Sequence, residues 1–249
     1  MRTLLQLRRI GGTASAAFEL SARLGFLHAL EGPHNLRSRA IVLQQVARLL
    51  LDVHGIHVDE RGAAPADHAL LVANHVNYLD PLVVMSAHPA LPVAKEEVRH
   101  WPVIGALCER AGVQFVARAR AASGAAILRT MARTLREGTS ILNFPEGTTS
   151  EGRAVLPLKP ACFRVARLAG VAVVPVAIVW ESQDLSWTGD ASFLPHYLRV
   201  AGRQRIHVRV RWGAPLHATP QITDHDLAER ARDFLLRAVQ EPDGPAKCA

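Results

Sequence analysis

Residues 69–81 read Ala-Leu-Leu-Val-Ala-Asn-His-Val-Asn-Tyr-Leu-Asp-Pro, and this stretch decides the fold. The apolar run at 69–73 is typical of a buried β-strand. Pro81 suits the first turn of a helix, because the N–H group that proline lacks would have no partner there. A strand, a short turn and a helix are therefore expected in this order, with His75 and Asp80 at the turn.

The combination of His75 with Asp80 points to proton transfer. An imidazole is the side chain best suited to accept a proton from a hydroxyl group near neutral pH. If the chain turns between the strand and the helix, the Asp80 carboxylate can reach the other ring nitrogen and fix the tautomer. The spacing alone favours an ordinary hydrogen-bonded histidine at a strand end, and a second motif changes this balance.

A second polar turn follows another apolar strand, at residues 144–150, which read Phe-Pro-Glu-Gly-Thr-Thr-Ser. Both turns lie at the carboxyl end of a predicted strand, which is the edge where ligand sites of open α/β sheets collect. Glu146, Gly147 and Thr148 form a backbone-rich turn that can hold polar oxygen atoms of a substrate. A glutamate that only caps a helix is the plainer alternative.

Strands alternate with helices from about residue 54 onward. This pattern predicts the α/β class, with a mixed, largely parallel central sheet flanked by helices. Residues 121–137 form the clearest helix, and the last helix is expected to open at Thr223, with Asp226 completing a capping box. The predicted strands are 56–58, 69–73, 113–116, 140–144, 171–179 and 206–210.

Residues 1–52 are predicted to form an amphipathic helical N-terminal extension, which Gly32-Pro33 divides into two helices. Apolar residues recur at helical spacing with arginines between them, as in a helix that lies in a membrane interface. A helix that packs on its own domain would show the same pattern. The α/β domain is expected to span residues 53–240, and residues 241–249 to form a disordered tail.

The chain of 249 residues carries a formal net charge of +7, and nearly all of its positive charge comes from arginine. Guanidinium groups suit phosphate and carboxylate, which favours anionic lipid surfaces or the phosphates of CoA as partners. A GC-rich genome also enriches arginine, so the charge is weak support. Aromatic residues make up 5% of the chain and do not alternate with basic ones, so nucleic-acid binding is not predicted.

Metal binding and membrane spanning are not predicted either. The three cysteines are widely spaced, and no set of histidine, cysteine and acidic residues has a familiar ligand spacing. No uncharged apolar run reaches the roughly 18–20 residues of a spanning helix. The N-terminus begins with a charge and lacks the apolar core of a signal peptide. The protein is therefore expected to be soluble or to lie on a membrane surface.

Together, the two motifs resemble those of the glycerolipid acyltransferases of the lysophosphatidic acid acyltransferase type. The hallmarks of that family are His-x-x-x-x-Asp and Phe-Pro-Glu-Gly-Thr-Arg. Two weaker blocks agree with the family in order and spacing: residues 112–118, which end in an arginine, and the Val-Pro-Val run at 174–176. The resemblance spans about residues 54–212.

The resemblance implies a role for each of these residues. His75 is expected to take the proton of the acceptor hydroxyl, and Asp80 to orient it. Glu146 and Arg118 are expected to position the acceptor. Lys95 stands where the family often has a lysine before an acidic pair; it would help to bind phosphate or CoA, or simply begin a solvated helix. No nucleophilic serine or cysteine is required, because the acceptor hydroxyl itself attacks.

The chain departs from the family at Thr149, where the usual motif has an arginine. A neutral hydroxyl cannot make the charge-assisted bidentate contact that a guanidinium makes with phosphate. Either Arg153 replaces the missing arginine, or the acceptor lacks a phosphate monoester. The threonine variant and residues 101–105 resemble relatives that acylate lyso-ornithine lipids.

These observations predict an O-acyltransferase that moves a fatty acyl chain from acyl-ACP or acyl-CoA to the hydroxyl of a lysophospholipid such as 1-acyl-glycerol-3-phosphate. Lyso-ornithine lipid is the alternative acceptor. The enzyme is expected to need no cofactor besides the acyl donor, and to work as a peripheral protein on an anionic surface, the cytoplasmic face of the inner membrane. Two other readings stay open: a thioesterase or lipid hydrolase in which His75 activates water, and a non-enzymatic basic module.

Overall fold

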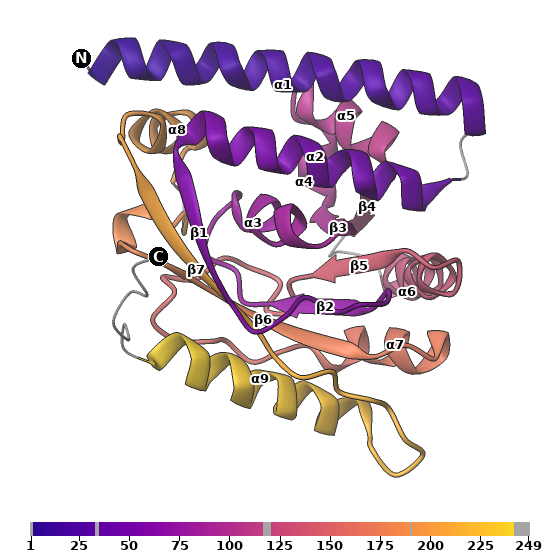
Figure 1. The fold of residues 1–249 in the computed structure, drawn as a ribbon. Helices are drawn as coiled ribbons and strands as arrows, with labels where there is room; N and C mark the ends of the chain where they lie inside the picture. The colour runs from indigo at the N-terminus through magenta and orange to yellow at the C-terminus, as the bar shows by residue number, and fades with distance from the viewer. Residues whose placement is uncertain (1, 33–34, 117–120, 190, 242–249) are drawn as a thin grey trace.

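A seven-stranded sheet forms the centre of the computed structural model, which describes residues 2–32, 35–116, 121–189 and 191–241 (Figure 1). The strands are β1 (Ile56–Arg61), β2 (Leu70–Ala73), β3 (Ala90–Lys95), β4 (Gln114–Val116), β5 (Ser140–Asn143), β6 (Val173–Trp180) and β7 (Ile206–Trp212). Their order in the sheet is β1-β7-β6-β2-β5-β3-β4. All neighbouring pairs are parallel except β6 with β7, which confirms the predicted mixed, largely parallel sheet.

Helices cover both faces of this sheet. Figure 1 shows α1, α2 and α3 on one side and α7 and α9 on the other. The central strands β2 and β5 are therefore buried on both faces, which explains why they read as continuous apolar runs. The helices are α1 (Arg2–Glu31), α2 (Leu36–His54), α3 (Asp80–Ala87), α4 (Glu96–Arg99), α5 (Ile104–Ala111), α6 (Ala121–Arg136), α7 (Arg164–Ala169), α8 (Phe193–Ala201) and α9 (Asp224–Gln240).

Local sequence signals account for several helix boundaries. Pro81 stands in the first turn of α3, as its missing N–H predicts. Thr223 caps α9: its side chain accepts the N–H of Asp226, whose carboxylate in turn accepts the N–H of Thr223. This reciprocal pair is the predicted capping box.

Strand β3 is not among the strands that the sequence predicts. Residues 81–94 look like one apolar run, but the chain ends α3 at Ala87 and then forms β3 between β5 and β4. The change from helical to strand periodicity is not visible in the sequence, because neither α3 nor β3 is long enough to show its own pattern of apolar residues and Pro92 interrupts the strand. Lys95 is consequently the last residue of a strand, immediately before the short helix α4.

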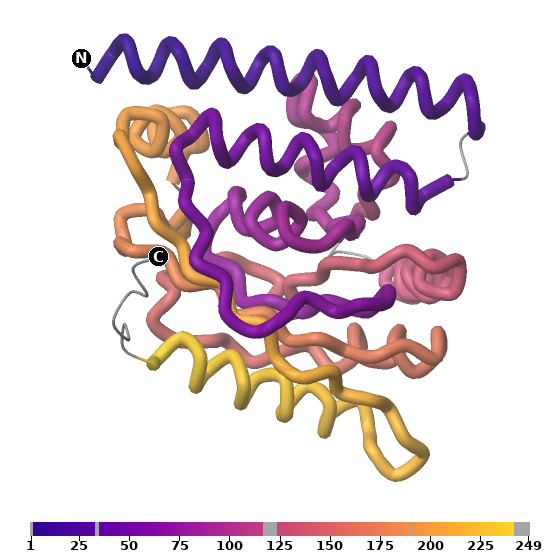
Figure 2. Tube along the Cα trace, in the orientation of Figure 1, coloured from indigo at the N-terminus to yellow at the C-terminus, as the bar shows by residue number. Residues whose placement is uncertain are grey.

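The first two helices form a hairpin on one side of the sheet, and Figure 2 shows α2 running back along α1. Helix α2 packs against α3 and β3, whereas α1 packs against α2, α5 and α8. Leu24 of α1 and Val46 of α2 belong to the same apolar cluster as the sheet. The predicted domain boundary near residue 53 stays a prediction. None of the described helices is long and apolar enough to cross a membrane.

A buried arginine connects α1 to the C-terminal end of α8. The Arg9 side chain is almost fully enclosed, and Thr13, one turn later, shares a hydrogen bond of 2.9 Å with the hydroxyl of Tyr197. Because a helix ends with unpaired carbonyl groups and a partial negative charge, a guanidinium is well suited to this place. The carbonyl oxygens that accept from Arg9 belong to Val200, Ala201, Arg203 and Gln204.

Replacement of Arg9 by methionine should therefore destabilise the protein. Arg9→Met removes the hydrogen bonds that the guanidinium donates to carbonyl groups at the end of α8 and in the loop after it, so we expect the free energy of unfolding to fall by about 2 kcal/mol. The matched control is Arg8→Met, because Arg8 is the exposed neighbour on the same helix. Urea denaturation of both variants checks this, and equal stability of the two would contradict the role of Arg9.

Candidate active site

Three parallel strands bring the candidate site residues to one edge of the sheet. Strands β5, β2 and β6 are neighbours and run in the same direction, so their carboxyl ends meet. His75 follows β2, Glu146 follows β5, and Trp180 is the last residue of β6. This is the edge at which open α/β sheets bind their ligands.

His75 and Asp80 form the hydrogen-bonded pair that the sequence predicts. The distance from His75 Nδ1 to Asp80 Oδ2 is 2.7 Å. The same oxygen accepts the backbone N–H groups of Val76 at 2.6 Å and Asn77 at 2.8 Å. Because the carboxylate accepts the proton of Nδ1, the other ring nitrogen, Nε2, is left as a base. The Asp80 side chain is 0% exposed and that of His75 is 17% exposed.

Trp180 is a site residue that the sequence analysis missed. Its indole Nε1–H donates to Asp80 Oδ1 over 2.7 Å, from a position one hundred residues further along the chain. One feature could have indicated this role: a tryptophan, which has an N–H to donate, stands at the carboxyl end of a strand beside β2. Every oxygen of Asp80 therefore has at least one donor.

Two further contacts fix the turn that carries His75. Asn74 forms a pair of hydrogen bonds with the backbone of Ile178 on β6, at 2.8 and 2.9 Å. The ring of Phe144 stacks on the imidazole of His75, with 4.2 Å between the ring centroids and 25° between the planes. The stacked ring covers one face of the imidazole and leaves its edge for hydrogen bonding.

Each oxygen of the Glu146 carboxylate accepts a backbone N–H group. Its Oε1 accepts the N–H of His75 at 2.8 Å, and its Oε2 accepts the N–H of Leu156 at 2.9 Å. The residue is 6% exposed. Burial raises the pKa of the Glu146 carboxyl above its usual value, and the two N–H donors oppose that rise. This carboxylate thus joins the two motifs directly.

The rest of the second motif also lies against the first. The N–H of Ser150 donates to the carbonyl oxygen of His75 at 2.8 Å. The hydroxyl of Thr149 donates to the carbonyl oxygen of Trp187 at 2.5 Å. The N–H of Trp187 in turn donates to Val76 at 3.0 Å. Thr149 therefore holds the segment that contains Trp187 beside the turn that carries His75.

The remaining predicted residues surround this centre. Gly147 adopts a positive φ of 73°, and the side chain of Lys159 lies directly over it. Thr148 is exposed, and Arg153 forms a hydrogen bond with the side chain of Gln183 at the surface. Lys95 lies at the end of β3. Arg118 and the tail after residue 241 lie outside the described residues.

A cluster of aromatic rings borders the turn between His75 and Asp80. Tyr78, which belongs to that turn, makes edge contacts with Trp187 and Phe193, and Trp101 contacts the same two rings. These four residues are each partly exposed. The Tyr78 hydroxyl also shares a hydrogen bond of 3.1 Å with His196 Nδ1, so α8 is attached to the turn between His75 and Asp80.

Comparison with known proteins gives the family. The family model named Acyltransferase matches residues 51–179, which include both motifs. The chain belongs to the acyltransferase family. It is 35% identical over 188 residues to the lyso-ornithine lipid O-acyltransferase of Brucella abortus, covering 68% of this chain and 70% of that one. It is 33% identical to the 1-acyl-sn-glycerol-3-phosphate acyltransferase of Neisseria gonorrhoeae, covering 83% of each chain.

A solved structure shares the fold of this acyltransferase. The crystal structure of the 1-acyl-sn-glycerophosphate (LPA) acyltransferase of Thermotoga maritima aligns with a TM-score of 0.73 at 21% identity, covering 98% of this chain and 100% of that one. In the described part of this acyltransferase, no three His, Cys, Asp or Glu side chains are grouped so that they could hold a metal ion.

The contacts of Glu146 predict how its replacement affects this acyltransferase. In Glu146→Gln, one oxygen is replaced by an NH₂ group that cannot accept a hydrogen bond, so the N–H of either His75 or Leu156 loses its acceptor and the link between the two motifs is broken. We expect kcat to fall about tenfold or more with the KM of the acceptor little changed. Steady-state kinetics of Glu146→Gln and of the exposed control Glu151→Gln measure this.

The opposite pattern would contradict this role of Glu146. If Glu146 grips the acceptor instead, as the resemblance implies, the KM of the acceptor rises in Glu146→Gln while kcat is kept. The Glu151→Gln control should retain both constants within about twofold, because its exposed side chain supports no part of the turn.

Proposed function

We propose that this enzyme transfers a fatty acyl chain from a thioester, acyl-ACP or acyl-CoA, to the free hydroxyl of a lysophospholipid such as 1-acyl-glycerol-3-phosphate. The observation that carries the proposal is the His75–Asp80 pair, whose remaining nitrogen is set to act as a base. Relatives named for this acceptor support it. No cofactor besides the acyl donor is required by this chemistry.

In the proposed reaction, His75 Nε2 takes the proton of the acceptor hydroxyl as its oxygen attacks the carbonyl carbon of the thioester. The buried Asp80 carboxylate stabilises the imidazolium that forms. The tetrahedral intermediate then collapses: the C–S bond breaks, the ester remains on the lysolipid, and the sulfur leaves with the proton from the imidazolium. A thiol with a pKa of about 8.5 leaves readily, so no stronger acid is needed.

The acceptor is positioned, in this proposal, by the turn that contains Gly147 and Thr148 and by the cationic side chains that the sequence predicts. Arg153 and Lys95 are the candidates within the described residues, and Arg118 is a further one from the sequence. The second acceptor that we consider is lyso-ornithine lipid. It is favoured by Thr149, which stands where the family has an arginine and whose hydroxyl donates to the backbone of Trp187, and by relatives named for that acceptor.

Loss of the His75 ring should abolish transfer without unfolding the protein. General-base catalysis contributes about 10²–10⁴-fold, so we expect His75→Ala to lose activity on that scale, whereas the exposed control His68→Ala keeps it. Thiol release from acyl-ACP and acyl-CoA is measured with lysophosphatidic acid, with lyso-ornithine lipid and without acceptor.

The acceptor dependence decides between the functions. Release that needs one of the two lysolipids and disappears in His75→Ala supports the transferase and identifies the acceptor. Release that is the same with and without acceptor would make the protein a thioesterase and refute the proposal. Substantial activity in a folded His75→Ala variant would refute the role of the imidazole.

We also propose that residues 1–52 attach the acyltransferase domain of residues 53–240 to an anionic membrane surface, the cytoplasmic face of the inner membrane. The support is the outer face of α1, which carries no charge although it is exposed. An ordinary surface helix places its charged residues there. The exposed residues on this face follow at intervals of three, four and seven: Leu4, Leu7, Gly11, Ala14, Phe18, Ala22 and Ala29.

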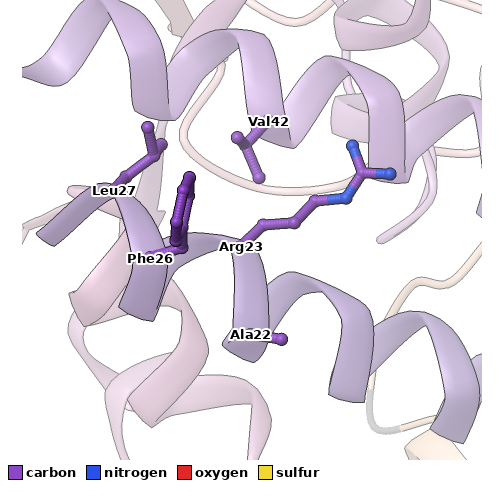
Figure 3. A pocket seen from close by; sticks show the side chains of 5 residues that line it. All are labelled: Ala22, Arg23, Phe26, Leu27 and Val42. Carbon is purple, nitrogen blue, oxygen red and sulfur yellow. The ribbon is translucent and has the colours of Figure 1, made fainter. Parts of the chain in front are cut away.

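Two arginines of α1 lie beside this face, as basic residues do in interfacial helices. Arg8 and Arg23 are both exposed beside it. A pocket opens between α1 and α2 next to Arg23, lined by Ala22, Arg23, Phe26 and Leu27 of α1 and Val42 of α2 (Figure 3). A basic side chain beside an apolar pocket suits the headgroup and the acyl chain of an anionic lipid.

A charge on the outer face of α1 should weaken membrane binding. Phe18 is 77% exposed, so Phe18→Glu changes the surface and not the core. We expect binding to phosphatidylglycerol vesicles to fall about tenfold or more. The control is Leu168→Glu, an exposed leucine of α7 on the other side of the sheet. Vesicle sedimentation measures both, and wild-type binding by Phe18→Glu would refute this attachment.

A further inference from the structure

We infer that Trp180 is a positioning residue, which holds the Asp80 carboxylate in place and thereby orients His75 for proton transfer. The inference rests on the function proposed above for His75. It concerns a side chain on β6 that belongs to neither of the two motifs. The indole is 8% exposed, and its N–H is directed at the carboxylate over 2.7 Å.

The two oxygens of Asp80 have different partners. Oδ2 accepts from His75 Nδ1 and from the N–H groups of Val76 and Asn77, all in the same turn. Oδ1 accepts from Trp180. Because the carboxylate is fully buried, loss of the indole N–H would leave Oδ1 without a donor, and rotation of the carboxylate would then draw Oδ2 away from His75.

Trp180 is well placed for this task because it belongs to a rigid element. Strand β6 pairs with β2 on one side and with β7 on the other, where Trp180 lies opposite Val208. Asn74, which precedes His75, is hydrogen-bonded to Ile178, two residues before Trp180 on the same strand. The start of the turn and its carboxylate are thus both fixed to β6.

The chemistry of indole also suits the position. A lysine or arginine here would compete with the His75 imidazolium for the negative charge of Asp80. The indole N–H is a donor without a net charge, so it fixes the carboxylate and leaves that charge to stabilise the imidazolium. It also cannot take the proton that His75 has to carry.

The chain contains a matched control for this residue. Trp212 ends β7, is 6% exposed, and donates its indole N–H to the carboxylate of Glu60 at 3.1 Å. Trp180→Phe and Trp212→Phe therefore remove the same ring atoms and the same kind of hydrogen bond from neighbouring strands. The two substitutions differ in whether the carboxylate belongs to the turn that carries His75, and also in its burial, because Asp80 is enclosed whereas Glu60 is exposed.

The kinetic test compares both variants with the wild-type enzyme. We expect Trp180→Phe to lower kcat about tenfold with the KM of the lysolipid little changed, and Trp212→Phe to keep kcat within about twofold. Double-mutant cycles with Asp80→Asn should show that the effect of Trp180→Phe largely disappears in that background. Equal losses in the two tryptophan variants, or additive effects with Asp80→Asn, would overturn the inference.

A spectroscopic test keeps the inference separate from the proposed function. With ¹⁵N-labelled histidine, NMR should show His75 protonated at Nδ1 in the wild-type protein and partly at Nε2 in Trp180→Phe. Benzothienylalanine at position 180 keeps the bicyclic ring and replaces the N–H by sulfur, so it should have the same effect in a protein that folds. An unchanged tautomer in both variants would overturn the inference even if the wild type shows no acyl transfer.

Discussion

The site depends on one buried carboxylate. A carboxylate that is withdrawn from water is tolerated only where donors replace the lost water molecules. Asp80 finds four N–H donors, and they come from the turn after β2 and from the end of β6. The relative placement of these two strands and the orientation of His75 are therefore a single constraint, since a shift of either would leave part of the carboxylate unpaired.

The contact between His75 and Asp80 can be predicted from the sequence, whereas the contacts from distant residues cannot. His75 and Asp80 are five residues apart, so one turn between a strand and a helix is enough to predict their contact. Trp180 reaches the same turn from a position 100 residues after Asp80. Glu146 reaches it from a position 71 residues after His75. Their contacts follow from which strands are neighbours in the sheet, and alternation of strands and helices does not determine that order.

The difference between the predicted and the observed fold has a local cause. Strand β3 was missed because Pro92 interrupts a short apolar run that α3 and β3 share. Both oxygens of Glu146 accept backbone N–H groups, and these supporting contacts are not visible in the sequence; its role in positioning the acceptor, which the family resemblance implies, stays a prediction. The capping box of α9 was predicted correctly, because Thr223 and Asp226 interact within one turn of the chain.

The main chain of His75 is held on both sides: Glu146 accepts its N–H, and Ser150 donates to its carbonyl oxygen. Together with the stacked ring of Phe144, these contacts leave the imidazole little rotational freedom before any substrate arrives. The entropy lost in orienting this imidazole is therefore lost once, when the protein folds, and not again each time a substrate binds. Binding of a lipid can then be used to bring the two reacting molecules together.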